Sequence, residues 1–457
     1  MIPFAAKLSA ARAAGSLARL TGRGGTTLPG KLLLRLDSRA IERLSRNLPE
    51  GNVVVSATNG KTTTAAMISS ILGREGKRLV HNRAGANMAG GIASTLAGAS
   101  GWDGRRLDGT FGLFEVDEFW LGSVAEQLQP RALLLSNLFR DQLDRYGELE
   151  TIAARWAAVA AENPEHRALI LNADDPLVAD LGRNRPRVTY FGVDDDSLAY
   201  SELQHASDSK HCRRCGTAYA YDAAYLAHLG HYHCPNCGAR RPQPSVVARN
   251  VELRGIRSAA FDLHAAGGSV RVELPLPGLY NVYNALGAAA LALELGATLN
   301  SVAAGLAAVK PAFGRAETVV MGSRDASLLL VKNPAGANEV LRTLALEAQE
   351  LDLLGVLNDG IADGRDVSWV WDADWELLQG KVRRVTCAGT RAPELALRLK
   401  YAGVDPARLR VVEPLDEALD AALSDGTGSI YVLPTYTALI ELKRLLSERG
   451  VSQEYWR

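Results

Sequence analysis

The chain has 457 residues, with 51 basic and 51 acidic side chains and 47% hydrophobic residues. This length is enough for about three domains of ordinary size. The balanced charge argues against a polyanion-binding surface over the whole chain, and no apolar run reaches the roughly 18 residues that a membrane span needs.

The first 49 residues form a basic segment that is expected to be helical. Its basic residues stand among Ala and Leu, and no acidic residue occurs before Asp37. This pattern predicts an amphipathic helix rather than a signal peptide, because no long apolar stretch follows. The helix packs on the first domain in one interpretation and contacts a membrane surface in the other. The basic residues within the first 25 positions are Lys7, Arg12, Arg19 and Arg23.

A phosphate-binding sequence follows at Val53–Thr64, which reads VVVSATNGKTTT. An apolar strand breaks at Asn59–Thr62 and leads into an alanine-rich helix. Backbone N–H groups and the positive end of the helix would face an anion. Lys61 would reach the β and γ phosphates, and the Thr62 hydroxyl would hold Mg²⁺. Val55 stands where the full motif has glycine, so an ordinary strand–helix turn stays the alternative.

From residue 50 onward, short apolar segments alternate with helical stretches. This alternation predicts an α/β fold with a doubly wound parallel sheet. Ligands bind at the carboxyl ends of such strands, so the polar residues that follow three of them should converge on the phosphate loop. The predicted strands are Val53–Ser56, Phe111–Val116, Ala132–Ser136, Ala168–Leu171 and Val188–Phe191, and the polar residues are Asp117, Glu118, Asn137 and Asn172–Asp175.

The alternation is interrupted once and then restarts after a domain boundary. Residues 201–244 form a polar insert rich in His and Cys, so the first α/β domain is predicted over residues 50–314 with this insert inside it. Beyond a boundary near Pro311–Arg315, residues 315–457 are predicted to form a second, smaller domain of the Rossmann type. The later predicted strands are Val270–Leu274, Ser327–Val331, Leu353–Leu357, Val382–Cys387, Leu409–Val412 and Ser429–Leu433.

Four of the five cysteines form two Cys-x-x-Cys pairs in the insert. Four thiolates complete a tetrahedron around zinc and leave no open position, so the expected Zn²⁺ is structural. Each pair is followed by a glycine, Gly216 or Gly238, which suits a tight turn between the sulfurs. A reducing cytoplasm is the expected compartment, because these cysteines are not a disulfide framework and no secretory signal is found. The four ligands are Cys212, Cys215, Cys234 and Cys237, and the neighbouring His211, His231 and His233 are left out.

A series of motifs resembles the central domain of Mur ligases. These enzymes join amino acids to peptidoglycan precursors through an acyl phosphate. The motifs occur in the order of that family. They are Thr58–Thr63 (TNGKTT), Glu115–Glu118 (EVDE), Asn137–Gly147, Asn172–Asp175, Gly278–Ala285 and Gly314–Glu317.

The insert and two later motifs narrow the resemblance to the MurT family, the synthetase subunits of lipid II isoglutaminyl synthase. Lys332–Asn338 reads KNPAGAN, and Asn358–Trp369 reads NDGIADGRDVSW. The resemblance covers about residues 25 to 440. It implies a Mur ligase-like central P-loop ATPase domain with a zinc-ribbon insert, followed by a smaller Rossmann-like domain that contacts a glutaminase subunit.

The resemblance implies ATP and Mg²⁺ as reaction partners. Phosphoryl transfer depends on positioning and charge neutralisation, which Lys61 and Mg²⁺ would supply. Thr62 and Glu115 match the magnesium ligands, and Arg315 matches a phosphate-facing cation. Asn281 would lie beside the nucleotide, although an Asn before an alanine-rich run is often only a helix cap. The implied nucleotide-binding residues are Thr58, Asn59, Gly60, Lys61, Thr62, Thr63, Glu115, Asn281 and Arg315, and Asn284 would lie near them.

The MurT family takes ammonia from a separate glutaminase subunit that carries a Cys nucleophile and a His base. This chain offers no such nucleophile, because four cysteines are assigned to zinc and Cys387 lacks the glycine-flanked turn. In this family, an Asp of the synthetase subunit completes the catalytic triad of the glutaminase. Asp366 matches that residue, and it would orient the imidazole of the glutaminase histidine. An ordinary loop acid, or a cap for the following Val367–Trp371 stretch, stays the alternative for Asp366.

The implied reaction is the ATP-dependent amidation of the α-carboxylate of D-glutamate in the lipid II stem peptide, which yields D-isoglutamine. The lipid anchor of the substrate would bring a cytoplasmic complex to the inner face of the membrane. A Mur or folylpolyglutamate-type ligase is the first alternative, and the missing Asp-Tyr-Ala-His-type motif at Val331–Gly336 counts against it. A zinc-ribbon ATPase that binds nucleic acid is the second, and the neutral charge and few aromatic residues count against it.

Overall fold

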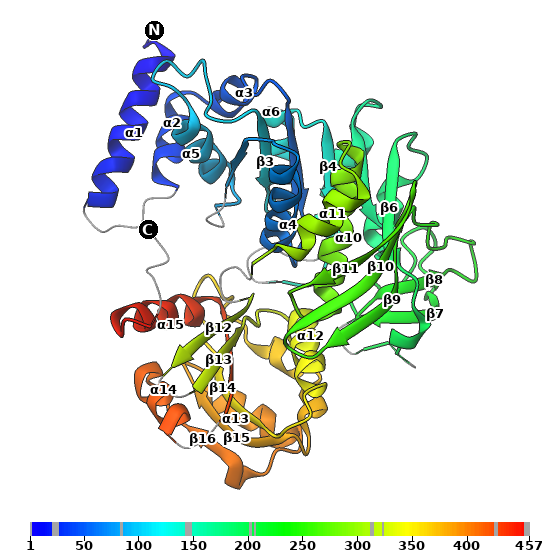
Figure 1. Cartoon of the computed structure of the whole chain (residues 1–457), viewed down its shortest axis with the longest axis vertical. Coiled ribbons are helices and arrows are strands. Elements are labelled where there is room, and N and C mark those ends of the chain that lie inside the picture. The colour runs from blue at the N-terminus through cyan, green and yellow to red at the C-terminus, as the bar shows by residue number, and fades with distance from the viewer. Residues whose placement is uncertain are drawn as a thin grey trace.

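Two β-sheets organise the chain, and Figure 1 shows the smaller one below the larger one. The structure is a computed structural model. It describes residues 2–20, 27–82, 86–141, 149–200, 203–204, 207–310, 315–321, 324–424 and 428–451. The predicted domain boundaries at 49/50 and 314/315 stay predictions.

Within the described residues the large sheet has nine strands in the order β11-β10-β9-β6-β5-β4-β1-β3-β2. In the part of the sheet from β6 to β2, every pair of neighbouring strands is parallel, as the βα alternation predicts. Every predicted strand of this region corresponds to a strand of the sheet. The strands are β1 (Asn52–Ser56), β2 (Leu79–His81), β3 (Phe111–Glu115), β4 (Ala132–Leu135), β5 (Ala168–Asn172), β6 (Val188–Val193), β9 (Val246–Arg254), β10 (Ser258–Ala265) and β11 (Gly268–Leu274).

Helices cover both faces of the large sheet, which explains why its central strands are apolar on both sides. Val53 and Val55 point into one core and Val54 into the other, as the period of two along a strand requires. The first core is completed by α4 (Lys61–Arg74), α10 (Leu279–Glu294) and α11 (Leu299–Ala307). The second is completed by α5 (Ala89–Ala99), α6 (Leu121–Leu128), α8 (Leu149–Ala161) and α9 (Pro176–Ala179), together with the N-terminal helices.

One edge of the large sheet differs from the sequence prediction. Strands β9, β10 and β11 form an antiparallel meander, which joins the sheet through a parallel pairing of β9 with β6. The sequence predicted only the last of these three strands. Polar and charged side chains occur along both β9 and β10, so their apolar runs, Val246–Ala248 and Ala259–Phe261, are only three residues long.

The N-terminal basic segment packs on the large-sheet region, as in the first of its two interpretations. Leu8 and Ala11 on α1 (Phe4–Leu20) are fully buried, and the Arg12 guanidinium donates to the Ala97 carbonyl at 3.0 Å. Two further helices, α2 (Leu28–Leu36) and α3 (Ala40–Ser45), complete this layer. Among the described helices, none is both long and apolar enough to cross a bilayer.

The small sheet has six strands over the described residues, in the order β12-β13-β17-β14-β15-β16. It is parallel except for β12, which pairs antiparallel with β13 and which the sequence did not predict. The strands are β12 (Arg315–Met321), β13 (Arg324–Leu329), β14 (Leu351–Val356), β15 (Val382–Ala388), β16 (Leu409–Val411) and β17 (Ile430–Pro434), and the helices are α12 (Pro334–Ala345), α13 (Ala392–Tyr401), α14 (Leu415–Ser424) and α15 (Tyr436–Glu448).

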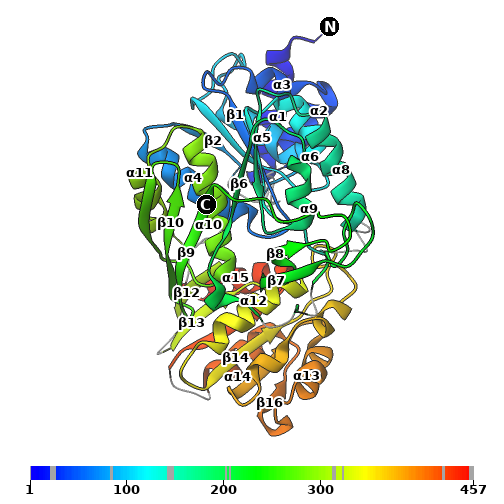
Figure 2. The same ribbon diagram turned by 90° about the vertical axis from the view of Figure 1, so that its right-hand side faces the viewer.

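Helix α12 places the small-sheet region against the Cys-rich insert. The guanidinium of Arg342 on α12 donates to the carbonyl oxygens of Tyr225 and Leu198, at 2.9 and 3.0 Å. Tyr225 belongs to a hairpin of the insert formed by β7 (Ala220–Leu226) and β8 (Leu229–His233). Figure 2 shows α12 beside this hairpin. The insert therefore borders both sheet regions.

Candidate functional site

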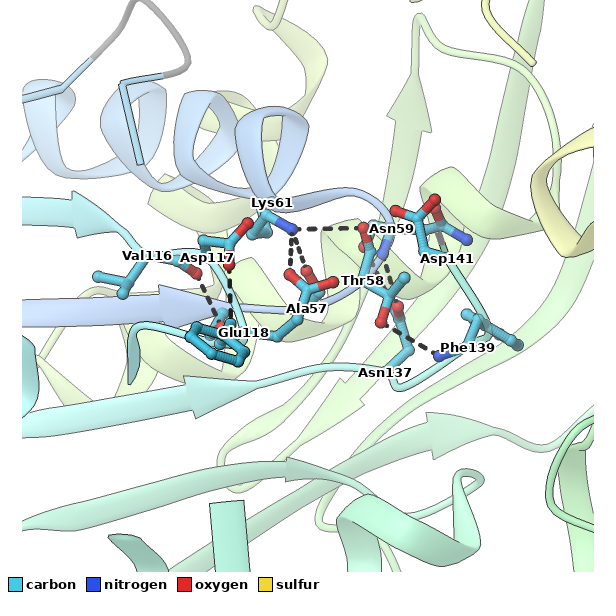
Figure 3. A network of polar contacts seen from close by, with 12 residues as sticks. Ala57, Thr58, Asn59, Lys61, Val116, Asp117, Glu118, Asn137, Phe139 and Asp141 are labelled. Atoms are coloured by element: carbon cyan, nitrogen blue, oxygen red, sulfur yellow. Dashed lines mark hydrogen bonds and ion pairs between the residues drawn. The ribbon is translucent and has the colours of Figure 1, made fainter. Parts of the chain in front are cut away.

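The predicted phosphate loop joins β1 to α4, and side chains of a neighbouring loop hold it in place (Figure 3). The Asn137 amide accepts from the backbone N–H of Asn59 at 2.9 Å and donates to its carbonyl at 3.0 Å. The Thr58 hydroxyl accepts from the Phe139 N–H at 3.1 Å. No side chain caps the start of α4 at Gly60. The first N–H groups of this helix therefore have no side-chain acceptor at the cap position. Such N–H groups can bind an anion.

Lys61 is buried inside this loop and forms an ion pair with Glu118. Its ammonium group lies 2.8 Å from the Glu118 carboxylate and also donates to the carbonyl oxygens of Ala57 and Thr58 (Figure 3). Burial alone would lower the pKa of Lys61, but the charges of Glu118 and Asp117 outweigh it, and the pKa lies above its usual value. Lys61 is therefore a permanent cation held at the start of α4.

The predicted magnesium ligands lie on two adjacent elements. Thr62 is the second residue of α4, and Glu115 is the last residue of β3, opposite Val55 on β1. Glu115 is buried, and its backbone is fixed by two hydrogen bonds with the Asn82 amide, at 2.8 and 3.0 Å. Thr63 lies beside them and lines a cavity. The role of these residues in metal and nucleotide binding stays a prediction.

The remaining residues predicted to lie near the nucleotide, Asn281, Asn284 and Arg315, occupy different positions relative to the phosphate loop. Asn281 stabilises the first turn of α10, because its amide donates to the Pro277 carbonyl at 2.7 Å and accepts from Asn284 at 3.1 Å. Asn284 lines the cavity next to the phosphate loop, and Asn281 is absent from that lining. Arg315 is the first residue of β12, and the prediction for its side chain lies outside the described side chains.

A cavity opens between the phosphate loop and the small-sheet region. It encloses about 830 Å³ of empty space, part of it open to solvent, and Asn59 and Gly60 line it from one side and α12 from the other. Beside the cavity, the Asn333 and Asn59 amides exchange two hydrogen bonds, at 3.0 and 3.3 Å. Lys332 donates to the Thr58 carbonyl at 3.3 Å and forms an ion pair with Asp141. The two sheet regions thus meet at the phosphate loop.

Asp366 lies on an exposed loop after β14, at the edge of a second, smaller cleft. Arg140, Asp141 and Lys332 line the same cleft. Hydrogen bonds from the Ser368 side chain and backbone N–H lower the pKa of Asp366, and the N–H bond measures 2.8 Å. Asp366 is therefore ionised at neutral pH and accessible from outside, next to the junction of the two sheet regions.

The four predicted zinc ligands cluster, and all their sulfur atoms lie within 4.8 Å of one another. The closest pairs are Cys212 with Cys237 at 3.6 Å and Cys215 with Cys234 at 3.4 Å. A Zn–S bond of about 2.3 Å in a tetrahedron gives sulfur–sulfur distances of about 3.8 Å, so this set fits the ion. The glycine after each pair has a positive φ, +74° at Gly216 and +72° at Gly238, as the predicted tight turns need. The three nearby histidines contribute nothing to the described cluster.

The sequence assigned no individual role to four residues that shape the site. Glu118 stands in the Glu115–Glu118 motif and was expected near the phosphate loop, but its ion pair with Lys61 was not predicted. Asn137 clamps the phosphate loop, and Lys332 and Asn333 reach it from the small-sheet region. Position after a strand was the available signal for the first two residues. The last two begin the Lys332–Asn338 motif, but their contact with the loop depends on the packing of the two sheet regions.

Gly60 offers a test of the loop geometry. Its φ is +85°, and a Cβ atom there would stand 2.0 Å from Asn284 Oδ1. Gly60→Ala should therefore weaken nucleotide binding and lower the unfolding free energy by about 1–3 kcal/mol, as measured by calorimetry and denaturant titration. Gly73→Ala is the matched control on α4, because nothing lies within 4 Å of its added Cβ. It should be neutral or stabilising by about 0.5–1 kcal/mol. Equal effects of the two variants would contradict this account of Gly60.

Two family models match the chain. Residues 55–239 match the Mur ligase middle domain, and residues 330–439 match the MurT ligase C-terminal domain. The first match contains Thr58–Thr63 of the phosphate loop and all four clustered cysteines, and the second contains Lys332, Asn333 and Asp366.

Similar proteins agree with these matches. The structure of a pseudomurein peptide ligase type C from Methanothermus fervidus superposes with a TM-score of 0.64 at 22% identity, over 88% of this chain and 79% of that one. MurF ligase from Thermotoga maritima in complex with ADP gives a TM-score of 0.63 at 15% identity, over 90% of this chain and 82% of that one. Both likenesses show a Mur ligase-like fold.

A sequence relative narrows the family. The MurT subunit of lipid II isoglutaminyl synthase (glutamine-hydrolyzing) from Streptococcus pneumoniae strain ATCC BAA-255 / R6 is 33% identical over 438 residues, which is 95% of either chain. Such similarity over nearly the full length, together with the two domain matches, shows that this chain belongs to the MurT family of Mur ligase-like synthetase subunits.

Proposed function

We propose that the chain uses ATP to activate the α-carboxylate of D-glutamate in the lipid II stem peptide, and that ammonia from a separate glutaminase subunit then forms D-isoglutamine. The observation that carries the proposal is a phosphate loop with a buried lysine, opening onto a cavity that the MurT-type C-terminal region closes. Membership of the MurT family supports the substrate and the nitrogen source.

The chemistry takes two displacements. A carboxylate oxygen attacks the γ-phosphorus of ATP, the bond to the β-phosphate oxygen breaks, and ADP leaves. Ammonia then attacks the acyl carbon, phosphate leaves, and the nitrogen loses a proton. The first step builds up charge on the phosphoryl oxygens, which a fixed cation stabilises. Lys61 would supply that cation once a phosphate replaces Glu118 as its partner.

Thr62 and Glu115 would hold Mg²⁺ at the same place. A hydroxyl and a carboxylate are oxygen ligands of the kind that this ion prefers. Magnesium bound there would neutralise charge on the transferred phosphoryl group. Two observations support this magnesium assignment. Glu115 is buried, and it pairs with Val55 on β1, just before the phosphate loop.

The ammonia would come from another polypeptide, because no described cysteine of this chain suits glutamine hydrolysis. Cys387 is fully buried in β15, and burial raises the pKa of its thiol to about 12. A thiol of that kind does not supply the thiolate that attacks an amide. The other cysteines form the four-sulfur cluster.

The surface around Asp366 would receive the glutaminase. Large apolar side chains are exposed there: Ile361 by 75%, Trp371 by 48% and Tyr401 by 71%. Trp371 and Tyr401 contact each other with ring centroids 5.8 Å apart, and Leu397 lies one turn before Tyr401 on α13. Exposed apolar clusters of this kind mark contact surfaces between proteins. A partner docked on them would cover Asp366. The lipid anchor of lipid II would keep the complex at the inner face of the membrane.

Zinc would hold the insert against the nucleotide cavity. Leu226 and Leu229 of the insert line that cavity, so Cys234→Ser should abolish bound zinc, raise the KM for ATP and lower the melting temperature by about 5 °C or more. Since one kcal/mol corresponds to about 2–4 °C in a domain of this size, this shift in melting temperature represents a loss of about 1–3 kcal/mol. Elemental analysis, steady-state kinetics and thermal melts measure the three effects. Cys387→Ala, a cysteine outside the cluster, should keep zinc. Full zinc content in Cys234→Ser would contradict the assignment.

An assay without the partner tests the proposed function. The purified chain with ATP, Mg²⁺, lipid II and an ammonium salt should produce amidated lipid II and ADP, whereas glutamine in place of ammonium should give no product. Product formed from a free amino acid without ammonium would instead indicate an amino-acid-adding ligase.

A further inference from the structure

Asp141 lines the cleft at Asp366, and one of its two carboxylate oxygens has no partner. The side chain is 7% exposed and forms an ion pair with Lys332 through Oδ2. Its Oδ1 atom is buried and accepts no hydrogen bond from the described residues. A buried carboxylate oxygen without a partner costs free energy. An N–H donor that reaches Oδ1 would remove that cost.

Lys332 connects the Asp141 carboxylate to the phosphate loop. Its ammonium group donates to the Thr58 carbonyl at 3.3 Å and also to Asp141. Lys332 lines the cavity at the phosphate loop as well as the cleft that contains Asp141 and Asp366. Figure 3 shows Asp141 next to Asn59 of the phosphate loop. Asp141 is therefore close both to the loop that would hold ATP and to the surface that would receive the glutaminase.

The amide-forming step needs a proton acceptor near the attacking nitrogen. Ammonia gains a positive charge as it bonds to the acyl carbon, so the nitrogen has to lose a proton. A carboxylate within hydrogen-bond reach can take that proton, and such a base contributes about 10²–10⁴-fold to the rate. Burial raises the pKa of Asp141 above its usual value, although the charge of Lys332 opposes this. A raised pKa makes the carboxylate a better proton acceptor.

We propose that the Asp141 carboxylate binds the incoming ammonia through Oδ1 and accepts a proton from its nitrogen as the amide forms. In this step the C–N bond forms, the bond between the acyl carbon and the phosphate oxygen breaks, and phosphate leaves. One N–H proton moves to Asp141, which later releases it to water. The positive charge of Lys332 favours the ionised carboxylate, which is the form that can accept the proton. The proposal rests on the proposed function, since it requires an acyl phosphate at the phosphate loop.

Asp141→Asn tests the proposal, because an amide keeps an oxygen for Lys332 but does not accept the proton. With lipid II, ATP and Mg²⁺, the variant should form amide about 10²–10⁴-fold more slowly than the wild type. The loss should occur with an ammonium salt and, in the assembled complex, with glutamine. Acyl phosphate formation should persist, measured as the burst of ADP in a rapid-quench experiment. Asp372→Asn in the same cleft is the control and should behave as wild type.

Hydroxylamine separates a role in proton transfer from a structural role. Its nitrogen loses a proton more readily than that of ammonia, so it depends less on a base. The product is a hydroxamate. The difference in rate between Asp141→Asn and the wild type should therefore be at least about tenfold smaller with hydroxylamine than with ammonium. Thermal melts check that the variant is folded, and Asp141→Ser, which also lacks the carboxylate, is a second variant with the same expected results.

Three outcomes would overturn the assignment of Asp141 alone. The variants could form amide at the wild-type rate, they could lose the ADP burst together with the amide, or they could show the same defect with hydroxylamine as with ammonium. If the wild type itself forms no amide from ammonium, the proposed function fails and this assignment fails with it.

Discussion

Lys61→Ala should abolish amidation with either nitrogen source, glutamine or ammonium. The variant removes the cation that would stabilise charge on the transferred phosphoryl group, and cations in this role contribute about a thousandfold or more to kcat. Because the loss strikes carboxylate activation, added ammonium should not rescue it. Release of ADP that depends on lipid II measures this step directly. Retained turnover with ammonium would contradict the assignment of Lys61.

Loss of stability has to be separated from loss of catalysis in this variant. Removing Lys61 leaves the Glu118 carboxylate, which is 3% exposed, without its ion pair. Breaking a buried pair in this way costs about 3–5 kcal/mol. The double variant Lys61→Ala/Glu118→Gln removes the uncompensated charge as well. It should recover much of the melting temperature and stay inactive. Recovery of activity together with stability would show that Lys61 is only structural.

Asp366→Asn should abolish amidation with glutamine and spare amidation with ammonium. The account gives Asp366 the role of orienting the imidazole of the partner's catalytic base, and an amide there favours the wrong tautomer, which lowers kcat by about 10⁴ in other triads. The Asn side chain still offers an oxygen to the Ser368 N–H, so the loop should keep its shape. The measurement is product formation by the assembled complex with each nitrogen source.

Asp372→Asn is the matched control for Asp366. Asp372 lines the same cleft and lies 3.4 Å from Arg140, yet no triad role is assigned to it. It should keep both activities. If Asp366→Asn reduces both activities equally, Asp366 has no part in the partner's triad.

The sequence predicted those parts of the fold and site that local patterns determine. Val53–Val55 is fully buried on both sides, so its apolar run marks a central parallel strand. Gly60 has to adopt a positive φ at the turn, so its position is visible as a motif. The cysteine spacing indicates the four-sulfur cluster because both pairs must turn tightly around one ion. Asp175 stands directly before Pro176, a sequence typical of a helix start, and its side chain accepts from the N–H groups of Leu177 and Val178.

The parts that were missed depend on contacts between distant segments. Strands β9, β10 and β12 lie at or near sheet edges, and each contains at most three consecutive apolar residues, so they lack the longer apolar run of a buried strand. The pairing of Lys61 with Glu118 joins residues 57 positions apart. The ion pair of Lys332 with Asp141 joins residues 191 positions apart. Only the packing of the small-sheet region against the phosphate loop brings these two residues together.

An isotope experiment tests most directly whether this chain activates a carboxylate through an acyl phosphate before ammonia attacks. Lipid II labelled with ¹⁸O in the α-carboxylate of its D-glutamate would be incubated with the chain, ATP, Mg²⁺ and an ammonium salt, and the released phosphate analysed by mass spectrometry. The account predicts one ¹⁸O atom in phosphate for each amide formed. Amide formation with unlabelled phosphate would contradict it.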